Sequence, residues 1–445
     1  MNATDKHINK FLTLFHTFEN SLNGEKSKPF HEWRRTAIDR LQQLSFPRRK
    51  DEEWKYTPVT RIVSPTYSVP PQAKLTKEQL EQTQVKNLDA LRLVFVNGQF
   101  QPEISDAQSL PQGIQMLPMS EASNQKGFRS LIEELLIDTT ENGEDPFVTL
   151  NTAFSKDSLL FHVDRNAVID HPIHLVNINT REKQAFFVNP QKLFYIESGA
   201  QVTFIESYQS TDPEAVYFNN VVNRVHVGAN AKMHHYRLQT ESPSAFQINN
   251  TDIYQGRDSV YSHYNVDLGG RMIRNNLNAF HQGENVTSNF YGGFMGRNEQ
   301  HIDSHTLVDH RVPNCQSNEL YKGILTDKAR GVFNGKVIVH KDAQKTNAFQ
   351  QNSSLLLSDH AVMDAKPQLE IFADDVKCSH GATIGQLDEE SVFYLRSRGL
   401  TDQKARETLQ TAFLLEVMDL VPDPALREHM GQLITNKLAE AAPHL

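Results

Sequence analysis

Cysteine is scarce in this sequence. Only Cys315 and Cys378 occur among 445 residues, and they form no C-x-x-C pair. One chain therefore lacks the cysteines for a four-cysteine zinc or iron–sulfur site. In a secreted protein the two could form a disulfide, whereas an intracellular protein would keep both as thiols, and one of these could have a chemical role.

Motifs of common catalytic sites are also absent. The sequence contains no G-x-x-x-x-G-K-[ST] loop, so we expect the chain not to hydrolyse ATP by itself. It contains neither H-E-x-x-H nor G-x-S-x-G, the local motifs of many zinc proteases and serine hydrolases. These absences favour a protein that is not an enzyme in its own right.

Long apolar runs and an excess of basic charge are missing too. No run approaches the roughly 18 apolar residues that span a bilayer, and the first residues lack the zones of a secretion signal, so we expect a cytoplasmic protein. The formal net charge is −9, and the basic residues 48–50 are followed directly by the acidic residues 51–53. Nucleic acid and membrane are therefore unexpected partners.

The composition is that of a folded protein, with 38% hydrophobic and 22% charged residues. A chain of this length is long for one domain. The patterns along it predict three units: a mixed helical domain over residues 1–148, a β-rich core over 149–385, and a helical domain over 386–445.

Apolar residues at helical spacing predict two helices before residue 48. The two apolar stripes consist of Ile8, Phe11, Leu12, Phe15, Phe18 and Leu22, and of Trp33, Ala37, Leu41 and Leu44. Pro29 and Pro47 bracket the second stripe, as is typical of helix boundaries. The helices could form a projecting arm or pack on the main body, and the pattern does not decide between these arrangements.

Residues 60–150 show mixed patterns. Asn97-Gly98 lies between apolar stretches and predicts a β-hairpin over residues 91–100. The spacing over residues 126–139 predicts another short helix.

The core region alternates short β-rich segments with tight turns, and no long helical pattern interrupts it. Predicted strands include residues 193–196, 202–205, 221–227, 336–339 and 369–372. The turn at Gly199 recurs 29 positions later at Gly228. An imperfect period of this size, built from strands alone, favours a parallel β-solenoid, in which each coil buries its inner face by stacking on its neighbours.

A β-sandwich is the alternative for this region. It would require antiparallel hairpins, for which Asn-Gly is the strongest short signal. Between residues 150 and 385 that pair occurs only at Asn334-Gly335, so the sequence favours the solenoid.

Three helices are predicted after residue 386. Asp388 can cap a helix that ends at Gly399, Thr401 can cap the next, and Asp423-Pro424 can begin the third. Some apolar residues exceed what one packing face needs, which predicts a docking surface for a partner. The candidate docking residues are Phe393, Leu409, Phe413, Leu414 and Val417.

One segment of the core suggests chemistry: Cys378-Ser379-His380 near its end. In a strand, residues two apart share a face, so the thiol and the imidazole would project together. Such a pair could hold iron, sulfide or a persulfide, but two ligands are too few for a stable cluster. The other ligands would have to come from another subunit. Taken alone, a buried cysteine beside a hydrogen-bonded histidine is the simpler interpretation of a C-x-H motif.

The sequence around this segment is far more specific than a C-x-H motif. DDVKCSHGATIGQLD at residues 374–388, followed by FYLRSRG at 393–399, resembles the C-terminal motif of the SufB/SufD family of iron–sulfur cluster assembly proteins. Residues 48–58, 93–98 and 171–175 resemble other family motifs. The similarity covers essentially the whole chain. It is greater to the SufD branch, because SufB members look more like His-Glu-Ala-Thr at residues 380–383 and carry more cysteines.

The resemblance implies a right-handed parallel β-helix between helical terminal domains. It also implies a complex with SufB and the SufC ATPase, with SufC on the C-terminal helices, and a possible homodimer when SufB is absent. Cys378 and His380 would lie at the interface with SufB, where a transient iron–sulfur cluster forms. His380 would be a ligand or proton-transfer group, and Cys378 a ligand, a sulfur relay or a packing residue. The chain alone would bind no cluster stably.

Three alternatives stay open at this point. The chain could be a SufB-like sister subunit, or a structural partner that only stabilises SufB. It could also be a solenoid polysaccharide lyase, although such enzymes are usually secreted and the sequence offers no convincing pair of acidic residues.

Overall fold

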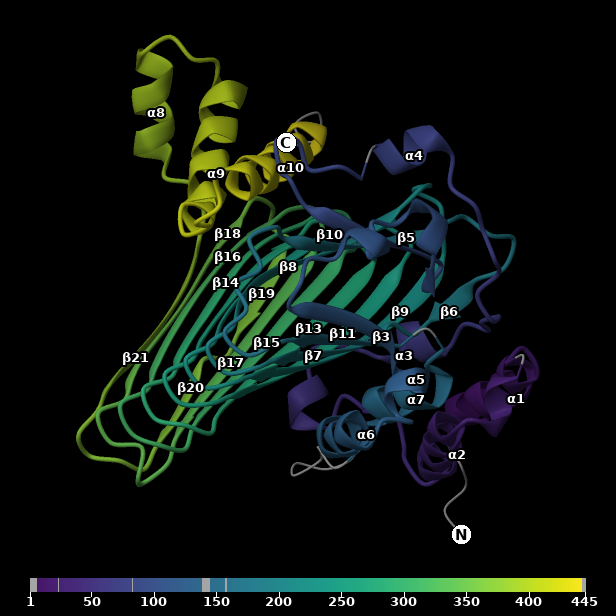
Figure 1. Cartoon of the computed structure of the whole chain (residues 1–445). Coiled ribbons are helices and arrows are strands. Elements are labelled where there is room, and N and C mark those ends of the chain that lie inside the picture. Colours follow the sequence, from purple (N-terminus) through teal and green to yellow (C-terminus); the bar gives the residue numbers. More distant parts are fainter. Residues whose placement is uncertain (1–5, 23, 82, 138–144, 157, 442–445) are drawn as a thin grey trace.

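The computed structural model describes residues 6–22, 24–81, 83–137, 145–156 and 158–441 (Figure 1). Its centre is a parallel β-solenoid whose coils contribute strands to two facing sheets. Among the described strands, antiparallel pairing is confined to β1 with β2 and to β3 with β4. The prediction of a solenoid rather than a sandwich is therefore confirmed.

One sheet has ten strands within the described residues. In spatial order these are β2 (Gln99–Phe100), β1 (Leu91–Val96), β5 (Ile173–Asn179), β8 (Gln201–Ser210), β10 (Lys232–Thr240), β12 (Val260–Asp267), β14 (Thr287–Gly296), β16 (Gln316–Leu325), β18 (Asn347–Leu356) and β21 (Lys377–Gly385).

The facing sheet has eleven strands in the same described part of the chain. They are β19 (Val362–Ala365), β17 (Arg330–Val339), β15 (His301–His310), β13 (Met272–His281), β11 (Phe246–Gln255), β9 (Tyr217–Val227), β7 (Gln191–Ile196), β4 (Leu159–Val163) and β3 (Ile114–Pro118), with β20 (Gln368–Ile371) beside β17 and β6 (Phe186–Val188) beside β9.

The coils repeat at the spacing of their turns. Residues paired between successive strands of the ten-stranded sheet differ by 28 positions from Lys232 to Val260 and by 29 from Thr287 to Gln316. At one corner of the solenoid, successive turns place a residue in the left-handed conformation. These residues are Asn230, Asp258, Asn285, Asn314 and Lys345. Asn and Asp tolerate this conformation better than most side chains, so they mark the corners in the sequence.

The Asn334-Gly335 pair, which could have indicated a hairpin of a β-sandwich, has another role. Asn334 and Gly335 lie inside strand β17 and make no turn. A Cβ atom on Gly335 would lie 2.2 Å from Gln350 Nε2, so the glycine makes room for an inward-facing side chain from the facing sheet.

Helices α1, α2 and α7 lie on the outer face of the eleven-stranded sheet, whereas Leu80 of α4 packs with β1 and β5 of the ten-stranded sheet. Phe11, Phe15 and Phe18 of α1 share one apolar cluster with Phe187 and Phe218 of that sheet. The helices therefore pack on the main body and do not form an arm. The helices of this region are α1 (Lys6–Asn20), α2 (Pro29–Leu41), α3 (Thr60–Val63), α4 (Lys77–Glu81), α5 (Met119–Ala122), α6 (Lys126–Ile132) and α7 (Pro146–Phe154), with short 3₁₀ segments at Glu25–Ser27, Glu52–Trp54, Pro102–Ile104 and Ala107–Ser109.

The other local predictions for this region are mostly confirmed. The hairpin forms from β1 and β2, with Asn97 and Gly98 both at positive φ. The predicted helix over 126–139 is α6 followed by a π-helical turn at Glu133–Ile137, and its last predicted residues lie outside the described residues.

Within the described residues, three helices follow the solenoid: α8 (Glu389–Ser397), α9 (Asp402–Met418) and α10 (Pro424–Ala441). The Asp388 and Thr401 side chains accept hydrogen bonds from the first backbone amides of α8 and α9, as predicted. Helices α9 and α10 pack on the outer face of the ten-stranded sheet, whereas α8 contacts α9 and stands away from the solenoid (Figure 1). None of the helices described is long and apolar enough to cross a membrane.

Candidate functional site

Strand β21 ends the ten-stranded sheet. It pairs in parallel with β18 along one edge, and its other edge has no partner strand in the described part of the chain. An unpaired edge presents a row of backbone donors and acceptors on which another strand can add. The segment identified from the sequence therefore lies where the solenoid can be extended by a second subunit.

Cys378 and His380 lie on the side of β21 that continues the solenoid interior. Their strand neighbours, Ala348 and Gln350, are both buried inside the solenoid. Because strands stacked in register keep each column of side chains on one face, Cys378 and His380 share that face. Both residues belong to the last coil of the described solenoid, and no further described coil stacks on β21.

The two residues differ in exposure. Cys378 is half-buried and packs with a small apolar cluster that includes Val339 and Ala348. Burial raises the pKa of its thiol. His380 is exposed and borders a surface groove lined also by Tyr291, Asn318 and Phe349. The imidazole is thus accessible, whereas the thiol is partly covered by its own chain.

A buried carboxyl lies close to His380. Gln350, the strand partner of His380, donates from Nε2 to Glu319 Oε1 at 3.2 Å, and Thr306 Oγ1 donates to Glu319 Oε2 at 2.6 Å. Burial raises the pKa of Glu319 to about 7. A group that titrates near neutrality therefore lies one side chain away from the exposed imidazole.

The N-terminal segment around residues 48–58 is fixed to the solenoid. The Arg274 guanidinium lies over the Trp54 ring, and its Nη1 donates to the Glu53 carbonyl oxygen at 2.7 Å. Arg274 also pairs with Asp303, whose carboxylate accepts a hydrogen bond from Thr57. Burial alone would raise the pKa of Asp303, but the charges of His305 and Arg274 lower it well below its usual range. This segment is therefore held on the solenoid through β13 and β15.

The five candidate docking residues divide into two groups. Leu414 and Val417 are fully buried and pack against the outer face of the ten-stranded sheet with residues such as Tyr236 and Tyr264. They belong to the core of this chain and leave no surface for a partner, which corrects the prediction for these two residues. The sequence could not reveal this, because it does not indicate that the solenoid has an apolar outer face.

The other candidates keep some exposure. Leu409 and Phe413 are half-buried, and the Lys322 ammonium lies 4.5 Å from the centre of the Phe413 ring. Phe393 of α8 is 72% exposed, and its neighbour Tyr394 is 57% exposed. Two adjacent exposed aromatic residues on a helix that stands away from the core are typical of a docking surface.

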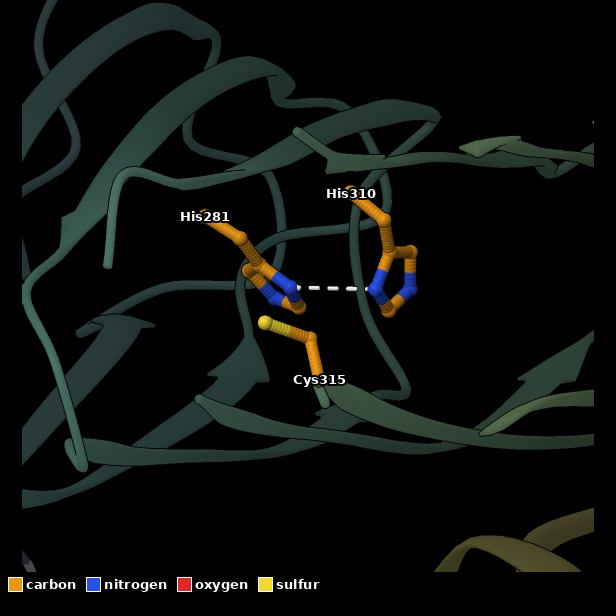
Figure 2. Close-up of side chains that lie close together, drawn as sticks. All are labelled: His281, His310 and Cys315. Carbon is orange, nitrogen blue, oxygen red and sulfur yellow. Dashed lines mark hydrogen bonds between the residues drawn. The ribbon is translucent and has the colours of Figure 1, made fainter. Parts of the chain in front are cut away.

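The structure also forms clusters that sequence reasoning missed. Inside the solenoid, Glu206 pairs with Lys192 at 2.6 Å and with His235 at 2.8 Å. At one corner, His281, His310 and Cys315 bring three potential ligand atoms within 4.8 Å of one another (Figure 2). The spacing of 29 residues between the two histidines equals one coil and was the available signal.

Comparison with known proteins agrees with this architecture. Residues 177–413 match the family described as "SUF system FeS cluster assembly, SufBD core domain", and residues 5–175 match "SufBD protein N-terminal region". The chain is 36% identical over 409 residues to the iron–sulfur cluster assembly SufBD family protein slr0076 of Synechocystis, covering 90% of each chain.

Two further relatives are similar over most of their length. The iron–sulfur cluster assembly protein SufD of Escherichia coli is 32% identical over 441 residues, which is 96% of each chain. Protein ABCI7, chloroplastic, of Arabidopsis thaliana is 31% identical over 431 residues, covering 94% of this chain and 88% of the relative. These matches confirm the resemblance found in the sequence, and the chain belongs to the SufBD family of iron–sulfur cluster assembly proteins.

Proposed function

We propose that this chain is the SufD-type subunit of a SUF assembly complex: a non-catalytic scaffold that pairs with SufB and with the SufC ATPase. A nascent iron–sulfur cluster forms where β21 meets the SufB solenoid, and His380 and Cys378 face it. The cluster is the cargo of the complex, and the isolated chain does not hold it stably. The complex works in the cytoplasm.

The observation that carries the proposal is the position of the Cys378–His380 strand. It is the terminal strand of the ten-stranded sheet, with one edge unpaired among the described residues and an exposed imidazole. A partner solenoid that pairs with this edge would bring its own side chains beside His380 and Cys378. Two ligands from each subunit would complete the four that common clusters require.

The two residues suit different tasks. An exposed imidazole can bind iron directly or transfer a proton, and the nearby Glu319 supplies a second group with a pKa of about 7. Burial raises the pKa of the Cys378 thiol, so its sulfur becomes a ligand only when iron replaces its proton. Cluster formation at this site would therefore release a proton.

Two further features support the proposed partners. The sequence lacks a phosphate-binding loop, so ATP hydrolysis belongs to another subunit. The exposed Phe393 and Tyr394 of α8 provide an apolar surface on a helix that lies far from α1 and α2 (Figure 1), and this surface is suited to docking of an ATPase subunit. In the absence of SufB, the same β21 edge can pair two copies of this chain.

Co-purification with SufB and SufC, followed by iron and acid-labile sulfide analysis, tests the proposal. We expect one stable complex that contains all three subunits and more cluster than SufB and SufC form without this chain. Equal cluster content with and without the chain would mean that the chain is only a structural partner of SufB. Failure to bind SufB at all would overturn the proposed function.

A further inference from the structure

One corner of the solenoid lies at the ends of β13 and β15 and the start of β16. The buried residues at this corner change from apolar to polar and back to apolar from one coil to the next. At the strand-end position, the successive coils carry Val227, Gln255, His281, His310 and Val339, which are paired in register from one coil to the next. All five are buried. The column is thus apolar at both ends and polar in the middle.

The two histidines face each other inside this corner. His281 Nδ1 and His310 Nδ1 lie 3.1 Å apart, and both side chains are fully buried (Figure 2). Cys315, also fully buried, lies in the turn after β15, and its sulfur lies beside the His281 ring (Figure 2). One nitrogen of each ring and the sulfur all lie within 4.8 Å of one another.

The outer nitrogen of each ring is held by a serine. His281 Nε2 lies 2.8 Å from Ser288 Oγ, and His310 Nε2 lies 2.9 Å from Ser317 Oγ. Ser288 Oγ donates to Gln255 Oε1, because the Gln255 amide nitrogen donates to the Thr287 carbonyl oxygen. Ser288 must therefore accept the proton of His281 Nε2, which leaves a lone pair on His281 Nδ1.

This assignment determines the rest of the metal-free cluster. His310 Nδ1 carries a proton and donates it to His281 Nδ1, and His310 Nε2 accepts from the Ser317 hydroxyl. The Cys315 thiol has the carbonyl oxygens of Gly283 and Pro313 within 3.6 and 3.5 Å. Both rings are fully buried, and in this assignment each carries one proton, so both imidazoles are neutral, as metal ligands must be.

We propose that His281, His310 and Cys315 form a buried site for one borderline-soft divalent ion of the first transition row, such as zinc(II), bound through two Nδ1 atoms and one thiolate. This site is separate from the proposed assembly strand and does not depend on the proposed function. Two imidazoles and one thiolate are a common ligand combination for such ions.

The geometry suits this ion class. Two nitrogens bound to one zinc at about 2.0–2.1 Å with a tetrahedral angle lie about 3.3 Å apart, close to the distance observed between the histidines. A zinc-bound sulfur would lie about 3.6 Å from each nitrogen, so the Cys315 side chain has to approach the rings. The Ser288 and Ser317 hydroxyls orient the rings through their outer nitrogens, as outer partners of zinc-bound histidines do.

Binding of the ion to this site releases one proton in total. The ion takes the place of the proton shared between the two Nδ1 atoms, and His310 changes tautomer so that its Nε2 donates to Ser317. The Cys315 sulfur loses its proton to solvent as it binds the ion. The exposed Asn314 adjoins Cys315 in the turn, so the site lies one layer below the surface.

Cobalt(II) is a suitable probe, because a thiolate bound to it gives a charge-transfer absorption band. The full chain would be treated with a chelator, titrated with cobalt(II) and then with zinc(II). We expect one equivalent of cobalt(II) to give the band and zinc(II) to abolish it. Cys315→Ser should lose the band, and Ser288→Ala should weaken binding by about 10- to 100-fold. Cys378→Ser, which changes the other cysteine, should keep the band.

A second measurement uses only the wild-type chain, so it tests the proposal even if a variant at this corner fails to fold. With the wild-type chain, zinc(II) should raise the thermal midpoint and protect Cys315, but not Cys378, from alkylation. The absence of a cobalt–thiolate band in the wild-type chain would overturn the proposal, and so would a band that persists in Cys315→Ser and disappears in Cys378→Ser. In either case the cluster would be a pair of histidines that share a proton.

Discussion

The guanidinium carbon of Arg274 lies 3.7 Å from the centre of the Trp54 ring. Arg274 belongs to β13 in the solenoid, whereas Trp54 belongs to the N-terminal segment, so the contact joins parts of the chain that are far apart in sequence. Trp54 also packs against Phe147 of α7 at 5.3 Å between ring centres. It is therefore a central contact between the N-terminal region and the β core.

Replacing Trp54 with alanine should destabilise the chain strongly. Truncation of a buried aromatic side chain typically costs about 3–5 kcal/mol, and here it also removes the stacking partner of a buried cation. Denaturant unfolding monitored by circular dichroism would measure the change. Trp33, the second tryptophan of the chain, is half-buried, and Trp33→Ala is the matched control with a smaller expected loss. Equal losses in the two variants would contradict this role for Trp54.

Stability should fall as the pH decreases from about 6.5 to about 4. Burial lowers the pKa of His301 to about 4 and that of His174 to about 3, whereas an unfolded histidine titrates near about 6.5. In this window the unfolded chain takes up protons that the folded chain does not, so acidification favours unfolding. The slope from each such histidine approaches roughly 1.4 kcal/mol per pH unit.

His301→Gln tests this pH dependence. His301 Nε2 lies 2.9 Å from Thr57 Oγ1, and a glutamine can keep a hydrogen bond there without titrating. The variant should show a flatter loss of stability between pH 6.5 and 4 than the wild-type chain. His16→Gln changes an exposed histidine of α1 and should keep the wild-type slope. An unchanged slope in His301→Gln would refute the assignment.

His380→Ala should reduce the cluster content of the assembled complex much more than it reduces folding or assembly. The side chain is exposed, so its removal deletes little core volume, yet it takes away the proposed ligand or proton-transfer group. Iron and acid-labile sulfide per complex provide the measurement, with circular dichroism as the folding control. His171→Ala removes another exposed histidine, next to β5 near the other end of the sheet, and should leave cluster content unchanged. Normal cluster content in His380→Ala would rule out the role, and loss of the complex itself would indicate a structural histidine.

Cys378→Ser distinguishes the possible roles of this thiol. A comparable loss of cluster to that in His380→Ala is expected if the sulfur is a ligand or relay, because serine is a poor substitute for thiolate. A clearly weaker effect would mean that Cys378 only packs against Val339 and Ala348. The same iron and sulfide measurement on the purified complex separates these outcomes.

Phe393→Asp should abolish or strongly weaken co-purification with SufC and leave the fold intact. The side chain is largely exposed, so the substitution leaves the core unchanged, whereas a buried aromatic anchor at an interface can contribute about 2 kcal/mol or more. Val168→Asp places the same charge on another exposed apolar residue, in an isolated β-bridge with Gln201 before β5, and should have no effect on SufC binding. Unchanged SufC binding by the Phe393→Asp variant would show that the docking surface lies elsewhere.

The purified chain alone should neither bind nor hydrolyse ATP, because its sequence offers no phosphate-binding loop. Phosphate release and nucleotide binding measured on the isolated chain would test this. ATPase activity should appear when SufC is added and should disappear when the SufC nucleotide site is inactivated. Turnover by the isolated chain, free of contaminating ATPases, would contradict the prediction.

Much of the local structure followed from the sequence. The caps at Asp388 and Thr401, the hairpin at Asn97-Gly98 and the helix that begins at Pro29 depend on a few neighbouring residues. The solenoid was predictable because stacked coils force the same turn chemistry to recur at about one coil length. The family followed from long specific motifs at both ends of the chain.

Contacts between distant segments were decided only by the tertiary structure. Leu414 and Val417 looked available to a partner, because no sequence pattern showed that the outer face of the ten-stranded sheet would bury them. His281, His310 and Cys315 looked like scattered residues until coil stacking brought His281 beside His310 and placed the Cys315 turn next to both. The sequence determines which residues each coil carries, whereas the register of the coils determines which of them meet.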